Sequence, residues 1–417
     1  MRLAGPATVA ALSVTVVTLP AYGADLFTVT VTSNGQTGTA GFNSAEQAID
    51  EFKNGELTTL LPSYTTSSIA SGTIDYRGLL VTASYPTSGT TLHFQVPSLG
   101  IDQTFTGSDR NASQQDLLNY LKTGNEYGNI EHALAAVSPA DPVAGNPGSL
   151  QSTMSISGFN AAFSTAPGST GTSVSTSHAA GAAPGGQPNA IGIGAEFGHF
   201  TESNTNINAI TIPLSYNFGV GADDKYRIGI ELPLTYIDTQ GAKSGAASLG
   251  LDLTVPVTKY FSLTPRVAAG VTGSLDLASA AALWSSSVTS AFHFGYNGYG
   301  FVIGDMLGYS KSLNVSIGSY SVDPRIGDAF TKNGAMIAIP TDKFGLEIPF
   351  LPQSDLQLFV TDTRFWGTKL YEMSLQEVGF SFGSSALQVI GQDIRVGATY
   401  VHGQHSNGFI ANFGFAF

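Results

Sequence analysis

From Ala190 to the end of the chain, apolar and polar residues alternate in repeated runs. Every even-numbered position between Tyr226 and Tyr236 is apolar or aromatic, and Ile210–Phe218 and Leu249–Val257 repeat the pattern. A period of two predicts β-strands with one apolar face. The opposite face carries Gly, Ser, Thr and charged residues, a poor lining for a dry core because isolated buried charges are costly. The alternation therefore favours strands that meet lipid on one side and water on the other.

The composition agrees with a membrane protein that lacks hydrophobic helices. Only 11% of the 417 residues are charged, against about 25% in ordinary soluble domains. Beyond the N-terminus, no apolar run approaches the ~20 residues that a spanning helix needs. The absence of cysteine excludes disulfides and thiolate metal sites. A net charge of −13 argues against nucleic acid as a partner, because no basic stripe could neutralise phosphates.

Residues 1–24 are predicted to be a secretory signal peptide. Arg2 supplies the positively charged start, and Ala7–Leu19 is a short apolar stretch. The tripeptide Ala21-Tyr22-Gly23 has small residues at both positions that a signal peptidase reads. The apolar stretch is too short for a membrane anchor and no charged stop follows it. We therefore expect cleavage near this tripeptide and export of the remaining chain.

Residues 25–140 are predicted to form a small α+β domain, because the apolar period switches between 2 and 3.6 in this region. The turn signals Ser33-Asn34-Gly35 and Pro86-Thr87-Ser88-Gly89 separate extended runs. The expected elements are strands over Leu26–Val31, Leu79–Tyr85 and Thr91–Val96, and helices after Asn43, from Asn111 and over Ile130–Val137.

Residues 141–189 differ sharply from the domain before them. Pro, Gly, Ser, Thr and Ala dominate this segment, and charged residues are almost absent. Such a composition buries too little apolar surface to offset the entropy of ordering. We therefore predict a flexible Gly/Ser/Pro-rich linker here.

Residues 190–417 are predicted to form an all-β transmembrane antiparallel barrel of about 12 strands, with ten or fourteen left open. An even number of strands puts both ends of the barrel in the periplasm, and longer connections are expected on the outer side. The longest outer connection is predicted at roughly 310–333. The expected strands begin near residues 190, 207, 225, 247, 261, 286, 299, 334, 355, 376, 393 and 408.

The last predicted strand ends in a row of aromatic residues. Phe409, Phe413, Phe415 and the terminal Phe417 share one face, with Asn412 and Gly414 on the other. This pattern resembles the terminal strand of Gram-negative outer-membrane proteins. The resemblance implies residence in the outer membrane, and it implies that the barrel-assembly machinery reads this strand.

The order of signal peptide, small domain, linker and barrel resembles the autotransporter class of outer-membrane proteins. This resemblance implies that the linker threads the lumen and that the domain is displayed outside. The chain differs from the class in two respects: residues 25–140 are short and lack a repeat, and the segment before Ala190 is Gly/Pro-rich where the class has a helix.

Two functions remain open at this point, and a third is weaker. The first is an autotransporter-like barrel that anchors or displays the N-terminal domain, with no catalytic residue and no cofactor. The second is a porin-like channel for small polar solutes, with a periplasmic N-terminal domain. The candidate lumen-lining residues, which such a channel would use, are Arg227, Glu231, Asp252, Arg266, Glu377 and Arg395.

An enzyme is the third hypothesis, and the sequence gives it little support. His402 and His405 lie three residues apart, as in some metal sites, but no carboxylate or third histidine shares their predicted loop. His293 falls on the predicted inward face, yet no nucleophile motif accompanies it. We expect no metal site and no catalytic site.

Glycine recurs on the predicted inward face of the barrel. Small inward residues either ease the curvature of the strands or leave room in the lumen. The room could remain open to solute or could hold another segment of the chain. The inward glycines are Gly192, Gly194, Gly198, Gly229, Gly250, Gly270, Gly295, Gly379, Gly397 and Gly414.

Overall fold

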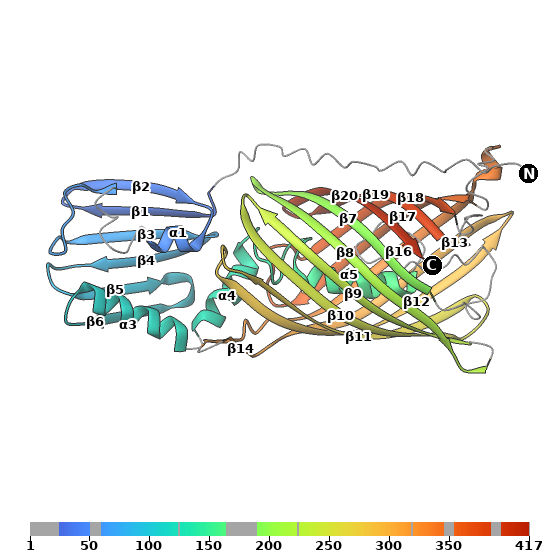
Figure 1. Ribbon diagram of the computed structural model, residues 1–417, viewed down its shortest axis with the longest axis horizontal. Coiled ribbons are helices and arrows are strands. Elements are labelled where there is room, and N and C mark those ends of the chain that lie inside the picture. Colours follow the sequence, from blue (N-terminus) through green and yellow to red (C-terminus); the bar gives the residue numbers. More distant parts are fainter. Residues whose placement is uncertain are drawn as a thin grey trace, which may run out of the picture.

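The computed structural model describes residues 25–50, 60–123, 126–163, 190–222, 225–317, 320–345, 354–384 and 393–416. The described chain forms a small α+β domain and a closed β-barrel, which lie end to end (Figure 1). The predicted signal peptide lies outside the described residues, so its cleavage stays a prediction. Among the described residues, no helix is both long enough and apolar enough to span a membrane.

The N-terminal domain is an antiparallel sheet of six strands in the order β2-β1-β3-β4-β5-β6. One face of the sheet is buried with the helices, and its core contains Phe27, Leu79, Phe94 and Leu134. The strands are β1 (Phe27–Ser33), β2 (Gln36–Phe42), β3 (Ala70–Tyr76), β4 (Leu79–Tyr85), β5 (Thr91–Val96) and β6 (Ile101–Thr106). The helices are α1 (Ala45–Asp50), α3 (Arg110–Thr123) and α4 (Glu126–Val137), with a short 3-10 turn at Pro97–Leu99.

Twelve antiparallel strands close the barrel, which confirms the predicted fold class and strand number. Closure occurs between the first and last strands, where Gly192 pairs with Ala416 and Glu202 pairs with Ser406. The strands are β7 (Ala190–Glu202), β8 (Thr205–Val220), β9 (Tyr226–Thr239), β10 (Ala242–Pro256), β11 (Phe261–Ser274), β12 (Ser279–Tyr296), β13 (Tyr299–Leu313), β16 (Gly327–Pro340), β17 (Ser354–Gly367), β18 (Ser374–Ser384), β19 (Asp393–Gly403) and β20 (Ser406–Ala416).

The connections at the two ends of the barrel do not show the expected difference in length. At the end away from Ala416, β7–β8 and β9–β10 are joined by two-residue turns with positive φ, at Ser203-Asn204 and Gln240-Gly241. Positive φ at both central residues matches the twist of a hairpin. Only the connection from β13 to β16 is long at this end, and it contains a small hairpin of β14 (Val315–Ile317) and β15 (Tyr320–Val322). The general difference in loop length expected from the sequence is therefore wrong, whereas the longest connection at this end falls within the predicted range of 310–333.

A helix, α5 (Leu150–Phe163), lies inside the barrel (Figure 1). The expectation of a flexible linker from residue 141 is therefore not met up to Phe163, and residues 164–189 lie outside the described residues. Every described residue from Leu150 to Asn160 is buried. Helices in proteins gain most of their stability from packing rather than propensity, and here strands β10–β13 and β16 of the barrel wall supply that packing.

The N-terminal domain is seated on the end of the barrel that lies opposite Ala416, called here the mouth. The backbone N–H of Ala45 donates to Asp276 O at 2.7 Å, and the Tyr76 hydroxyl donates to Leu277 O at 3.2 Å. Leu277 is fully buried and belongs to the apolar core of the domain. Domain and barrel therefore share one core at the mouth.

Candidate functional site: the threaded lumen and its mouth

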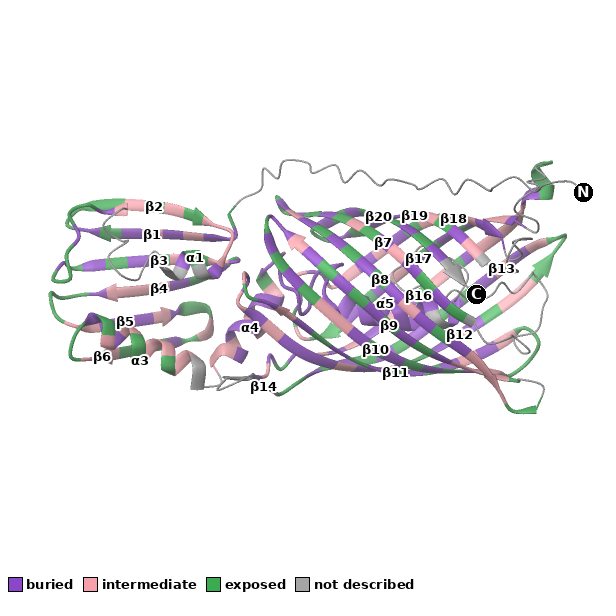
Figure 2. Cartoon of the chain, in the orientation of Figure 1, coloured by how far each residue is buried: buried purple, intermediate pink, exposed green. Residues whose placement is uncertain are grey.

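The outside of the barrel is apolar. Burial alternates along each strand, so that exposed and buried residues form diagonal stripes (Figure 2). Along β10 and β11, Leu249, Leu251, Val267 and Val271 are each at least half exposed. A closed barrel with an apolar outer face and a polar inner face is the arrangement that spans the outer membrane of Gram-negative bacteria. The protein is an outer-membrane barrel.

Only part of the aromatic row predicted on the last strand, β20, falls within the described residues. Phe409 and Phe413 are exposed on the outer face, where they meet lipid. The side chain of Phe415 and the whole of Phe417 lie outside the described residues. The reading of this strand by the barrel-assembly machinery stays a prediction.

The inside of the barrel holds the charged residues singled out in the sequence. Glu231, Asp252, Arg266, Glu377 and Arg395 are buried on the face opposite the lipid-facing residues. Arg227 is half-buried, and its guanidinium donates to Thr254 Oγ1 at 3.1 Å. Their role in passing solute stays a prediction.

The structure brings three of these residues into one cluster beside α5. Arg266 Nη1 lies 2.7 Å from Glu231 Oε2 and 3.6 Å from Asp252 Oδ2. The same guanidinium donates through Nη2 to Ser157 Oγ of the helix, at 3.2 Å. Arg266 offsets one of the two negative charges of the cluster and attaches the helix to β11.

The other two residues pair with partners that sequence reasoning missed. Arg395 forms a two-pronged ion pair with Asp355, at 2.7 and 2.9 Å. Glu377 accepts from Lys332 Nζ and, at 2.5 Å, from Thr361 Oγ1. One pair connects β17 to β19 and the other connects β16 to β18, so each crosses an intervening strand. Only the register of the closed barrel could therefore reveal them.

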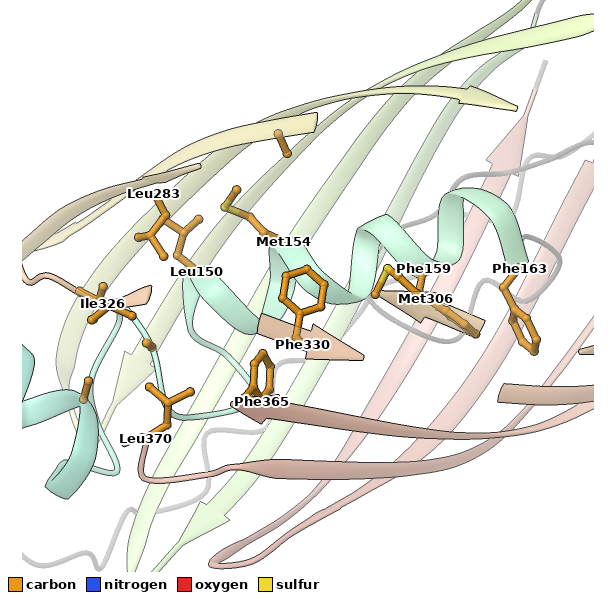
Figure 3. Close-up of a cluster of buried hydrophobic side chains, with 14 of the residues drawn as sticks. Leu150, Met154, Phe159, Phe163, Leu283, Met306, Ile326, Phe330, Phe365 and Leu370 are labelled. Atoms are coloured by element: carbon orange, nitrogen blue, oxygen red, sulfur yellow. The ribbon is translucent and has the colours of Figure 1, made fainter. Parts of the chain in front are cut away.

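Apolar side chains of α5 fill the space between the charged clusters (Figure 3). Leu150, Met154, Phe159 and Phe163 project from the helix toward the wall, where they join residues such as Met306 in one buried cluster. The cluster continues past the start of the helix to Val143, Ala144 and Ala135. One apolar core therefore runs from the mouth into the lumen.

Two inward glycines explain how the wall accepts the helix. A Cβ on Gly270 would lie 2.9 Å from Leu150 Cδ1, and a Cβ on Gly304 would lie 2.7 Å from Phe163 Cδ2. Real Cβ atoms do not approach that closely, so larger residues would push the helix away. Among the inward glycines predicted from the sequence, Gly270 therefore favours room for another segment of the chain, whereas a Cβ on Gly229, Gly250 or Gly379 would meet side chains of the wall. Gly304 was not among those predicted.

Several polar groups of α5 also find hydrogen-bond partners within the lumen. Ser155 Oγ donates to Gln151 O at 2.9 Å, a bond within the helix. Gln151 Nε2 reaches the wall and donates to Asp328 Oδ2 at 2.6 Å. Gly158 O accepts from Thr289 Oγ1 at 3.4 Å. The Ser-rich sequence that predicted a linker therefore suits a helix in which a serine hydroxyl donates to a backbone carbonyl of the preceding turn.

A second charged cluster lies between the domain and the mouth. Arg77, Glu131 and Asp141 are fully buried, with Arg77 3.5 Å from Glu131 and 3.8 Å from Asp141. Ser279 Oγ of the barrel donates to Glu131 Oε2 at 2.8 Å. Burial raises the pKa of Asp141 to about 8, and the charge of Glu131 adds to this effect. Burial also raises the pKa of Glu131, although Arg77 opposes it.

The contact between domain and mouth is therefore expected to weaken as the pH rises. A carboxyl that is free in solution titrates near about 4, so between that pH and about 8 the docked state holds a proton that the separated state has lost. The stabilisation is complete below about pH 4 and is lost as the pH rises through about 8. Hydrogen exchange of α4 should accordingly be faster at pH 9 than at pH 5, after correction for intrinsic exchange. Asp141→Asn should flatten this dependence, and an equally steep one in the variant would contradict the assignment.

The histidines considered for a metal site do not converge. His402 Nδ1 lies 2.7 Å from Asn407 Oδ1, whereas His405 Nδ1 lies 3.0 Å from Tyr371 O. Within the described ranges, no group of three or more His, Cys, Asp or Glu side chains is placed to hold a metal. His293 is half-buried on the inward side of β12.

No family model and no curated protein matches this sequence. Solved structures with a similar fold include the β domain of the Bordetella autotransporter BrkA, at 13% identity over 55% of this chain and 99% of that one, with a TM-score of 0.42. The translocator domain of the autotransporter NalP from Neisseria meningitidis has 11% identity over 56% and 88%, with a TM-score of 0.41. An outer membrane channel from Pseudomonas putida F1 has 9% identity over 58% and 98%, with a TM-score of 0.38. This similarity extends to translocators and channels alike.

Proposed function

We propose that this outer-membrane barrel displays its N-terminal domain on the cell surface, in the manner of an autotransporter, and holds it there as a fixed cap. The observation that supports the proposal is the path of the chain. The domain is seated on the mouth, and α5 runs from the mouth into the lumen toward the end where β7 begins. In this role the protein anchors and presents the domain and performs no catalysis.

The direction of insertion follows from the ends of the barrel. β7 starts and β20 stops at the same end, where Gly192 pairs with Ala416. Outer-membrane barrels with an even number of strands keep both ends in the periplasm. The mouth, which lies at the other end, then faces the exterior, and the domain seated on it is outside the cell.

A porin-like channel is the alternative function, and the contents of the lumen disfavour it. A channel for polar solutes needs charged groups that face an open path. Here Arg266 and Arg395 are each paired with carboxylates of the wall, and Leu150, Phe159 and Phe163 occupy the space between. These contacts favour a closed, threaded barrel.

An epitope tag inserted between Ser88 and Gly89 tests the proposal. This loop joins β4 to β5 at the end of the domain away from the barrel (Figure 1). Antibody should label the tag on intact cells, because the domain is outside. The matched control carries the same tag after Ala222, an exposed residue in the turn between β8 and β9 at the opposite end of the barrel. That tag should be labelled only after permeabilisation.

The reverse pattern of labelling would contradict display. A domain tag that becomes accessible only after permeabilisation, together with surface labelling of the Ala222 tag, would place the domain in the periplasm. Migration of the unheated protein in a gel would establish that each tagged chain is folded.

A further inference from the structure

Two buried glutamates lie near each other at the mouth. Glu202 is the last residue of β7 and is fully buried, and neither of its carboxylate oxygens has a hydrogen-bond partner among the described residues. Glu372, in the connection between β17 and β18, is 1% exposed. Neither carboxylate lies within ion-pair distance of a lysine or arginine in the described parts of the chain. Two carboxyl groups buried together need a proton or a cation to compensate their charge.

Three side chains from separate segments bring oxygen atoms together at this point. Ser406 starts β20 and lies directly opposite Glu202 in the sheet. A Cβ on Gly403 would lie 2.5 Å from Ser406 Oγ and 2.7 Å from Glu372 Oε2, so these two oxygens are close neighbours. Ser406 Oγ is buried and, like Glu202, has no partner within the described residues.

The groups around Glu372 leave it able to bind a cation. Its carboxylate accepts the backbone N–H groups of Gln404 and His405, each at 2.6 Å. A carboxylate has about four lone-pair sites, so two remain. His405 Nδ1 lies 4.0 Å from Glu372 Oε1. The same nitrogen lies 3.0 Å from the carbonyl oxygen of Tyr371, to which it donates a hydrogen bond.

We propose that Glu202, Glu372 and Ser406 bind a divalent cation of the calcium class. All three contribute oxygen, which hard cations prefer, and calcium tolerates irregular geometry better than magnesium does. Only two of the ligands carry charge, and calcium affinity depends on the number of charged ligands. We therefore expect weak binding, with a Kd of about 10⁻⁴–10⁻³ M, as in extracellular modules.

The cation would strengthen the attachment of the N-terminal domain. Tyr371 N donates to Ala135 O at 2.7 Å, and Glu372 N donates to Gly145 O at 3.1 Å. These two bonds connect the barrel to α4 and to the segment that leads into α5. A cation that joins Glu372 to β7 and β20 fixes this connection, whichever side of the membrane the mouth faces.

Terbium luminescence on the purified full-length protein, folded in detergent, tests the site. Terbium substitutes for calcium, and Tyr371 is placed to sensitise its emission because its hydroxyl lies 2.5 Å from Ser203 Oγ, next to Glu202. We expect tyrosine-sensitised emission that millimolar calcium removes. Glu202→Gln and Glu372→Gln should each weaken binding at least about tenfold, since each removes one of two charged ligands.

Glu196→Gln is the matched control, because Glu196 is a buried glutamate on the same face of β7. It should bind terbium and calcium as the unaltered protein does. Emission that calcium cannot displace, or an affinity in Glu202→Gln and Glu372→Gln that equals the affinity of the unaltered protein, would overturn the proposal. Gel migration of unheated samples shows which variants are folded, and Ser406→Ala, with an expected smaller loss of affinity, replaces any that are not.

Discussion

Replacing Lys332 with methionine is expected to lower the free energy of unfolding of the barrel by about 3–5 kcal/mol. Lys332 is completely buried, and its ammonium group donates to Glu377, which is 2% exposed. Among the described residues, the variant leaves the buried Glu377 carboxylate with only the Thr361 hydroxyl as a partner. The ammonium also lies 5.7 Å from the centre of the Phe159 ring, so the loss extends to the packing of α5. Urea titration in detergent, followed by tryptophan fluorescence, measures the change.

A double variant separates the lost pair from a general disturbance of the lumen. Lys332→Met with Glu377→Leu removes both charges, and it should recover most of the loss because no charge remains unpaired. Lys311→Met changes an exposed lysine on β13 in the same way and should stay within about 0.5 kcal/mol of the unaltered protein. Equal losses in Lys332→Met and Lys311→Met would contradict the role given to the buried pair.

The barrel could be predicted because its strands repeat a simple period. The predicted starts at residues 190, 261, 299 and 393 agree with β7, β11, β13 and β19. Three starts were too late by several residues, at β10, β12 and β16. These strands begin with stretches such as Ala242–Ser248, in which small residues hide the alternation of large apolar and polar side chains. The hairpin of β4 and β5 in the N-terminal domain was also predicted at its observed bounds.

The helix in the lumen could not be recognised from its sequence. Leu150–Phe163 contains no charged residue and several Ser, Gly and Ala residues, which is a composition typical of linkers. Isolated helices of this length are marginal in water. The packing that stabilises α5 comes from wall residues such as Met306 and Phe330, which lie more than 140 residues away in the chain.

The lumenal residues were predicted singly but not in pairs. Arg266 and Asp252 could be placed on one inward face, since register partners on neighbouring strands share a side. Arg395 and Asp355 lie on β19 and β17, with β18 between them, so their bond requires long side chains that cross a strand. Glu202 and Glu372 become neighbours only when β20 closes the barrel against β7, and no local motif marks them.

The ion conductance of the barrel is expected to depend on whether α5 is present in the lumen. A barrel of eight strands is just filled by its own side chains, and the interior widens roughly in proportion to the strand number. Twelve strands therefore leave space in the lumen. The helix α5 occupies it and lies close to Gly270 and Gly304. Removing residues 1–189 takes away the helix and the domain but leaves all twelve strands.

Planar-bilayer recordings of the mature chain and of residues 190–417, each shown to be folded by gel migration before and after heating, measure this directly. The mature chain is predicted to stay closed, because α5 lies in the lumen and the domain covers the mouth. The barrel alone is predicted to open and to conduct ions, with weak preference between cations and anions because its lumenal charges have both signs. Equal conductance in the two proteins would contradict the account of a threaded and closed barrel.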